Sequence, residues 1–428
     1  MRPLEKKKSP QARWQQPIAW FLTSQGITQV GSGLVQFALI WYVSNRTNSG
    51  ASLMVITVAS FLPQLLIAMF AGVWADRFNR KWIINLADGG IALVTLIIAI
   101  LFYYGIENIW LIYIISAVRS LGGGIQGPAI TAAIPQLVPR DQLVRINGIQ
   151  GTIGNLTQLL SPLLGGLALA LLPMFGIFFI DVTTAALAIT ILIFIPFPKT
   201  TSETLFPDGE ERTAAPVDLT GADAPVDSNW ESLKEGIRYI RESRLVSVLM
   251  LVYAAFMFLL SPVIVLMPIY LKRNFGEEPW RLTVAQTSLF AGMVVGGLVV
   301  SWIGKFKRKL NVIQTAGILI AFAAVALGLL GAFRSPLFVI FGSIAFVAGF
   351  MVPFYTTNVT VLLQEETTPD RHGRVFAVLY MIGSAAIPAG MLLFGPLADI
   401  IPIEVILFIA GALQLTIVYA SRRMLPNA

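Results

Sequence analysis

Twelve long apolar stretches divide the chain, and they limit its possible folds more than any other feature. A helix needs about 20 apolar residues, at about 1.5 Å each, to cross the hydrocarbon layer of a bilayer. Only 12% of the residues are charged, about half the share expected of a soluble protein. We therefore predict an all-α membrane protein with twelve transmembrane helices. The predicted spans are residues 18–43, 51–74, 82–104, 109–134, 146–172, 173–197, 245–271, 283–303, 312–333, 337–363, 374–400 and 403–420.

A polar segment between the sixth and seventh spans separates two halves of the chain. Residues 199–228 contain three prolines, several acidic residues and few large apolar ones, which is typical of a loosely ordered linker. Apolar side chains such as Trp230 and Ile240 then recur at helical spacing, so we expect an amphipathic helix on the cytoplasmic membrane surface. The expected parts are a tail (1–17), a six-helix bundle (18–198), the linker with its helix (199–244), a second six-helix bundle (245–421) and a short tail (422–428).

The two halves repeat short sequences at nearly equal offsets. The segment RFNRK at residues 77–81 is matched by KFKRK at residues 305–309. The segment GIQGP at residues 124–128 is matched by GFMVP at residues 349–353. Two matches at similar offsets predict two pseudo-symmetric six-helix bundles, related by an axis along the membrane normal. Gly304 stands where the first copy has an aspartate, so we do not expect the halves to be functionally equivalent.

Basic residues are distributed unevenly over the predicted loops. With the N-terminus inside, the cytoplasmic segments hold about 24 Lys and Arg and the outer loops about five. The positive-inside rule then predicts a multi-pass protein with both termini cytoplasmic. The net charge of +7 therefore reports topology, and no nucleic acid is expected as a partner. Membrane lipids are an expected partner, and the chain is expected to be a monomer.

The composition also limits the chemistry. The chain lacks cysteine and has a single histidine, His372, so we expect no metal site and no cofactor. The sequence contains no recognisable nucleophile–base pair and no Gly-rich phosphate-binding loop. An enzymatic activity is therefore not expected.

Three ionisable residues fall inside the predicted spans, where a charge costs at least about 2.5–3.5 kcal/mol. Arg119 lies near the middle of the fourth span and precedes three glycines, which let another backbone come close. It either attracts a carboxylate or tunes proton binding, or it belongs to a structural ion pair. Asp88 and Asp181 can each take up a proton, because burial disfavours the charged form. The alternative role for both is that of structural partner to a hydroxyl or an arginine.

Uncharged polar and aromatic residues recur across several spans. Aromatic rings and amides can hold bulky amphiphiles without strict geometry. Each residue alone is compatible with ordinary helix packing, but as a set they predict the lining of a substrate cavity. Its expected members are Gln25, Gln29, Gln36, Tyr253, Phe256, Gln286, Phe354, Tyr355, Asn358 and Tyr380.

The charged loop GVWADRFNRK, at residues 72–81, resembles the signature loop between the second and third helices of major facilitator superfamily transporters. Asn79 stands where that family usually has a second glycine. The residues that the resemblance assigns to the conformational switch are Asp76, Arg77, Arg80 and Lys81. It implies that Asp76 latches against the N-terminus of the eleventh span in the outward-facing state, where a carboxylate gains about 0.3–1 kcal/mol.

Other segments resemble the macrolide-efflux branch of that superfamily, which also includes a siderophore exporter. They are VRSLG (118–122), PQLVP (135–139), VPFY (352–355) and GRVF (373–376). The fifth span resembles the Gly- and Pro-rich signature of exporters that exchange substrate for protons, with a serine in place of the usual glycine before the proline. Small-residue helix packing is the alternative explanation. The residues concerned are Ser161, Pro162, Gly165 and Gly166.

The resemblance implies a secondary active transporter of the bacterial inner (plasma) membrane that exports bulky amphipathic compounds, such as macrolide drugs, by proton antiport. Its expected partners are then protons and a small amphipathic molecule. Alternating access of the two bundles would move the substrate, and Asp88 near Arg119 is the expected site of proton coupling. Two alternatives stay open. One is export of an endogenous metabolite such as a siderophore. The other is a non-transporting scaffold or sensor that recruits a partner through residues 199–244.

Overall fold

The computed structural model describes residues 14–139, 142–197, 238–304, 306–332, 338–367 and 371–424. The predicted linker, most of the predicted amphipathic helix and nearly all of the N-terminal tail lie outside these ranges. The side chains of Asp76, Arg77 and Tyr380 also lie outside the described part. The roles predicted for these segments and side chains therefore stay predictions.

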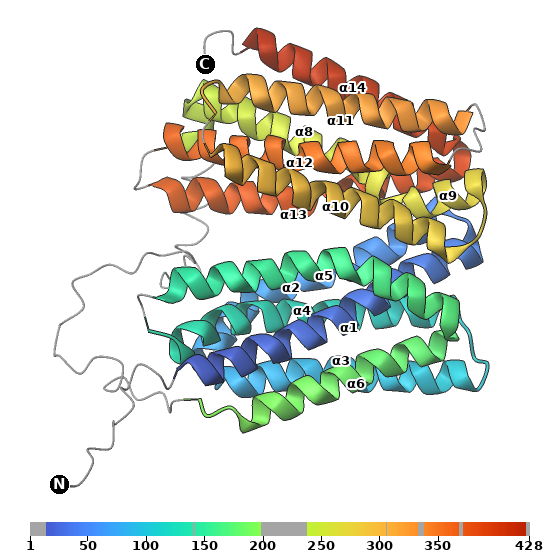
Figure 1. Cartoon of the computed structure of the whole chain (residues 1–428), viewed down its shortest axis with the longest axis vertical. Helices are drawn as coiled ribbons and strands as arrows, with labels where there is room; N and C mark the ends of the chain where they lie inside the picture. Colours follow the sequence, from blue (N-terminus) through green and yellow to red (C-terminus); the bar gives the residue numbers. More distant parts are fainter. Residues whose placement is uncertain are drawn as a thin grey trace, which may run out of the picture. The chain divides into compact units, whose positions relative to one another are not determined.

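The described chain is almost entirely helical (Figure 1). Twelve of its helices are long and apolar enough to cross a membrane, which confirms the predicted number of spans and the all-α fold class. The chain is thus a multi-pass membrane protein. Its helices are α1 (Gln15–Thr47), α2 (Gly50–Arg77), α3 (Arg80–Tyr103), α4 (Ile109–Leu137), α5 (Leu143–Leu171), α6 (Met174–Phe194), α8 (Arg244–Val265), α9 (Met267–Phe275), α10 (Pro279–Ile303), α11 (Lys309–Ala332), α12 (Phe338–Glu366), α13 (His372–Ile400) and α14 (Ile403–Met424).

The predicted seventh span differs from the structure, because it is divided into α8 and the short helix α9 at Leu266. Pro268 explains the break: it has no N–H to donate to the preceding turn, but it fits well in the first turn of a new helix. Helix α9 ends at Gly276, whose φ of 117° favours glycine.

Short side chains start several helices. Asn79 Oδ1 accepts a hydrogen bond from the Lys81 N–H (3.0 Å) at the start of α3. Asn108 Oδ1 accepts one from the Trp110 N–H (3.0 Å) at the start of α4. Such caps satisfy backbone donors that have no partner inside the helix. Asn79, which replaces a glycine of the family pattern, therefore has a local structural role.

The chain forms two compact units, whose borders fall inside three helices. The first unit comprises the described residues within Met1–Gln36, Ala59–Ser161 and Leu171–Ala215, and the second those within Phe37–Val58, Pro162–Ala170 and Pro216–Ala428. Helices α1, α2 and α5 therefore each contribute residues to both units.

In the first unit, α3 packs against α4 and α6 (Figure 1). Its core contains Phe21 of α1, Ile84 of α3 and Ala133 of α4, each fully buried. This packing brings together the helices that carry Asp88, Arg119 and Asp181.

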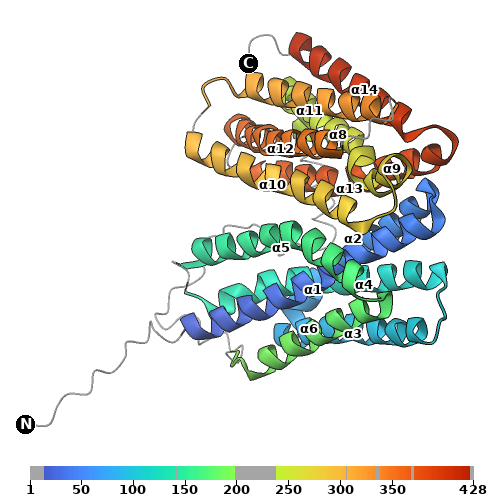
Figure 2. The same cartoon turned by 45° about the vertical axis from the view of Figure 1, so that its right-hand side comes forward.

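In the second unit, α11 packs against both α12 and α14 (Figure 2), and α10 packs against α12. The close approach of α10 and α12 needs glycine: a Cβ on Gly292 or Gly349 would collide with the backbone of the other helix. Small residues allow such contact between membrane helices. Next to this contact, the rings of Phe256 and Tyr355 are stacked with their centroids 3.9 Å apart.

Helix α2 contains Pro63 in its interior, where the proline cannot donate a hydrogen bond to the turn before it. A hydroxyl from α4 enters the opening. Ser120 Oγ donates to Ser60 O (2.7 Å) and accepts from the Gln64 N–H (3.0 Å). The hydroxyl therefore bridges two backbone groups that would pair directly in a regular helix, and insertions of this kind bend helices.

Candidate functional site

A buried ion pair joins α4 to α6. Arg119 Nη1 donates to Asp181 Oδ2, and the two side chains are only 8% and 1% exposed. The guanidinium also donates to Thr95 Oγ1 of α3 (2.9 Å), while Ser32 Oγ of α1 donates to Asp181 Oδ1 (3.2 Å). Four helices thus supply the hydrogen bonds that a buried ion pair needs to offset its loss of hydration. Arg119 is already neutralised by its partner.

The glycines after Arg119 were predicted to let another backbone come close, and Gly124 does so. A Cβ there would lie 2.7 Å from the carbonyl oxygen of Gln64, in α2. The absence of a side chain lets the backbones of α2 and α4 touch at the level where Ser120 also bridges them.

Asp88 lies in a different environment from Asp181. Its side chain is 3% exposed, and its Oδ1 accepts from Gln126 Nε2 (2.8 Å) and Thr28 Oγ1 (3.3 Å). Its Oδ2 has no hydrogen-bond partner, and among the described residues no ion pair includes it. The expected proximity of Asp88 to Arg119 does not take the form of a direct hydrogen bond. A buried carboxylate with two neutral donors and one free oxygen is able to hold a proton there.

The two environments are two levels of one arrangement, which we call the polar ladder. Asp88 and Thr95 lie seven residues apart on α3, and Arg119 and Gln126 lie seven apart on α4, so each pair shares a helix face. Gln126 bonds to Asp88 at one level and Arg119 to Thr95 at the other. The polar ladder consists of Thr28, Ser32, Asp88, Thr95, Arg119, Gln126 and Asp181.

Four members of the polar ladder were not anticipated as site residues: Thr28, Ser32, Thr95 and Gln126. A neutral hydroxyl or amide inside a membrane helix attracts less notice than a charge, because it is cheap to bury once it has a partner. The signal was nevertheless present, since Thr95 and Gln126 each lie two turns from a charged residue. Gln126 also belongs to the repeated GIQGP segment.

Of the three α1 glutamines predicted for the substrate cavity, Gln25 contacts the polar ladder. Gln25 is fully buried, and its Oε1 accepts from Gln126 Nε2 at 3.5 Å. Gln36 Nε2 donates to Ser60 Oγ (3.1 Å). Gln29 is half-buried.

The predicted cavity residues of the second unit fall into two groups. Phe256 and Tyr355 are buried from solvent, and Asn358 is 2% exposed, with its Nδ2 donating to Phe354 O of its own helix (2.8 Å). The half-buried group is Tyr253, Gln286 and Phe354. The half-buried group is therefore the more exposed to solvent, although the buried Phe256 lines an internal cavity.

The basic residue Lys81 is held at the end of another helix. Its Nζ donates to Ile193 O (2.7 Å) and Ile195 O (2.8 Å), the last carbonyls of α6. A cation at a helix C-terminus is stabilised by the helix dipole. Lys81 therefore fastens the start of α3 to the end of α6, while its neighbour Arg80 also begins α3.

The small residues of α5 are contact points between helices. Ser161 fits against Gly33 of α1, and its Oγ donates to Thr157 O (2.7 Å). A Cβ on Gly165 would lie 2.6 Å from the Phe37 ring, and one on Gly166 would collide with Thr283. Pro162 lies inside the same helix. These contacts are what small-residue helix packing requires.

Comparisons with known proteins agree with this arrangement. Residues 21–391 match the model of the Major Facilitator Superfamily. The chain is 27% identical to Macrolide efflux protein A of Streptococcus pyogenes over 94% of this chain and 95% of that protein. It is 26% identical to Multidrug efflux pump Tap of Mycobacterium bovis over 90% and 87% of the two chains.

Solved structures share the fold at low sequence identity. A D-xylose-proton symporter superposes with a TM-score of 0.67 at 12% identity, covering 94% of this chain and 97% of that one. The nucleoside transporter NupG superposes with a TM-score of 0.67 at 13% identity, covering 96% and 100%. The family match extends over most of the chain, and the twelve spans fit it. The chain therefore belongs to the Major Facilitator Superfamily of membrane transporters.

Proposed function

We propose that this transporter exports bulky amphipathic compounds, including macrolide-like drugs, by exchange for protons. Asp88 carries the proposal: it is a buried carboxylate with one free oxygen, it forms no ion pair among the described residues, and the buried Arg119 is already paired with Asp181. Relatives named as macrolide and multidrug efflux proteins support the substrate class. Transport, and not catalysis, is the proposed activity.

Proton uptake at Asp88 is the proposed coupling step. When the carboxylate is charged, Gln126 and Thr28 stabilise it through neutral hydrogen bonds. When a proton binds Oδ2, the group becomes a neutral acid, and its burial costs far less. Because the Arg119–Asp181 pair keeps its own charges balanced in both states, the net charge inside the first unit changes at Asp88 alone. That change biases the equilibrium between two conformations.

The remaining parts of the proposal concern the whole chain. Residues 18–198 and 245–421 act as two bundles that rock about a substrate site, with both termini in the cytoplasm of a bacterial cell and the chain as a monomer. Asp76 acts as a latch in the outward-facing state. The half-buried residues Tyr253, Gln286 and Phe354 contribute to the substrate site.

The test is transport into everted vesicles or proteoliposomes under an imposed pH gradient, with a macrolide and a panel of cationic dyes as substrates. We expect proton efflux to accompany drug accumulation. Asp88→Asn should abolish accumulation against a gradient while leaving downhill movement, and Asp88→Glu, which keeps a carboxyl group, should retain part of the coupling.

Three other results of the transport test would contradict parts of the proposal. Full gradient-driven export by Asp88→Asn would remove the proposed role of Asp88. Drug movement that ignores the gradient in the natural protein would indicate a facilitator. If no panel member moves, export of an endogenous metabolite or a scaffold role would replace drug export.

A further inference from the structure

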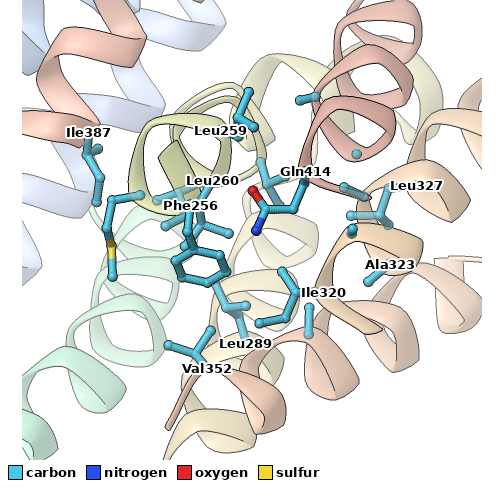
Figure 3. A pocket seen from close by; sticks show the side chains of 18 of the residues that line it. Phe256, Leu259, Leu260, Leu289, Ile320, Ala323, Leu327, Val352, Ile387 and Gln414 are labelled. Carbon is cyan, nitrogen blue, oxygen red and sulfur yellow. The ribbon is translucent and has the colours of Figure 1, made fainter. Parts of the chain in front are cut away.

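The second unit contains a cavity of about 250 Å³ among α8, α10, α11, α12 and α14, with Ile387 of α13 at its edge (Figure 3). No member of the polar ladder lines it, and none of its described lining residues is charged. The space exists because three helices present small residues toward it: Ala324 of α11, Ala348 of α12 and Gly411 of α14.

Among the described residues that line this cavity, one carries an unpaired polar group. Gln414 of α14 is 4% exposed, and neither its Nε2 nor its Oε1 has a hydrogen-bond partner. Figure 3 shows its amide directed toward Phe256 and Leu260. The other polar residue of the lining, Thr356, donates to Val352 O of its own helix (3.1 Å). Burying an unpaired amide is costly, so the cavity combines apolar walls with one amide that lacks a partner.

We propose that this cavity is a binding site for a neutral, bicyclic-sized apolar molecule that presents one hydrogen-bond donor and acceptor to Gln414. The site lies entirely within the second unit. It is additional to the proposed drug-export and proton-coupling function and does not depend on it.

Size and wall chemistry define the ligand class. An apolar cavity of about 150 Å³ in another protein takes up benzene, so a cavity of about 250 Å³ accommodates two fused rings. A cation or anion is disfavoured because no counter-charge lines the walls. Phe256 offers an aromatic surface that is held in place by its stacking on Tyr355.

Among neutral bicyclic molecules, the amide of Gln414 favours those that can pair with it by hydrogen bonds. A glutamine side chain offers a carbonyl acceptor and an N–H donor side by side. A cis-lactam presents the complementary pair and can form two parallel hydrogen bonds with it. A hydrocarbon of the same size gains the apolar contacts but leaves the amide unpaired.

The test is equilibrium binding to the purified full-length protein without any gradient, followed by ¹⁹F NMR. The probes are 6-fluoro-2-quinolinone, a bicyclic lactam, and 2-fluoronaphthalene, its apolar counterpart. Gln414→Leu should weaken quinolinone binding at least about tenfold, as expected from the loss of one or two hydrogen bonds. Its effect on 2-fluoronaphthalene should be much smaller. Ala324→Leu, which fills the cavity, should abolish saturable binding of both probes.

Gln150→Leu in α5 serves as the matched control, because it removes a glutamine with an unpaired oxygen outside the cavity and should change neither affinity. Absence of saturable binding, or equal losses for both probes in Gln414→Leu, would overturn the proposal. Monodisperse elution and an unchanged or raised Tm exclude misfolding as the cause of lost binding. Since no transport is measured, Asp88 can fail as a coupling residue without affecting this result.

Discussion

The space between the helices is filled differently in the two units. In the first, charged and polar side chains from four helices pair with one another around Arg119 and Asp181. In the second, the space between helices is apolar and partly unfilled, and one amide has no partner. Both are built from helices of similar length and hydropathy.

The internal repeat allows the two interiors to be compared position by position. At the offsets of the repeated segments, Asp88 corresponds to Ala316 and Thr95 to Ala323, while Arg119 corresponds to Ile344 and Gln126 to Met351. These four positions of the polar ladder are thus apolar in the second half, and Ala323 lines the cavity. The comparison teaches that a repeated helix pair can hold either a charge network or a ligand-sized space, depending on a few side chains.

The largest effect is expected when one partner of the buried ion pair in the first unit is removed. Asp181→Leu should lower the free energy of unfolding by about 3–5 kcal/mol, because it leaves Arg119 buried and unpaired. Thermal unfolding in detergent measures the effect. The double variant Asp181→Leu with Arg119→Leu should recover most of the loss, since apolar side chains can replace a buried pair. A double variant no more stable than the single one would contradict the account.

A second prediction tests the hydrogen bond between Gln126 and Asp88. Gln126→Leu should destabilise the protein by about 1–3 kcal/mol, because it takes away the shortest hydrogen bond to Asp88. Met351→Leu is the matched control at the corresponding position of the second half. It should cost less than about 1.5 kcal/mol, as volume-conserving apolar exchanges do. Equal melting temperatures for the two variants would argue against a specific role of Gln126.

The third prediction has the opposite sign. Gln414→Leu should raise the free energy of unfolding by about 1 kcal/mol, because it removes a buried amide that has no partner. Its Tm without added ligand should exceed that of the natural protein. Destabilisation by this change would mean that the amide has a partner under the conditions of the measurement.

The smallest effect is expected at Ser120. Ser120→Ala removes the hydroxyl that bridges Ser60 and Gln64, and the loss should be about 0.5–1.5 kcal/mol. Ser116→Ala is a suitable control, since that hydroxyl donates only within its own helix, to Ile112 O. Hydrogen exchange at the Gln64 amide should quicken in the first variant and not in the second.

The fold was largely predictable from the sequence, and the site only in part. Apolar length determines a membrane span almost by itself, so the predicted span from 283 to 303 differs from α10 only at its first turn. The break at Leu266 was missed because a proline near the end of an apolar stretch is tolerated in many helices. Whether such a proline bends the helix or ends it depends on the packing of the residues around it.

Charges inside the spans identified Asp88, Arg119 and Asp181, but not their pairing. Asp88 and Asp181 were both plausible partners of Arg119, and the choice is made by how α3, α4 and α6 are rotated against one another. Such rotations result from packing between helices, which no single helix encodes. The seven-residue spacings on α3 and α4 contain part of that information.

The prolines of α2 and α5 have a mechanical consequence. Helix α2 passes from one compact unit to the other at Val58 and Ala59, one turn before Pro63, and α5 passes at Ser161 and Pro162. A helix resists bending through its backbone hydrogen bonds, and each proline removes one of them. Both helices are therefore easiest to bend close to the residues where they pass from one unit to the other. In α2, the Ser120 hydroxyl holds the two sides of this weakened turn together through its bonds to Ser60 and Gln64.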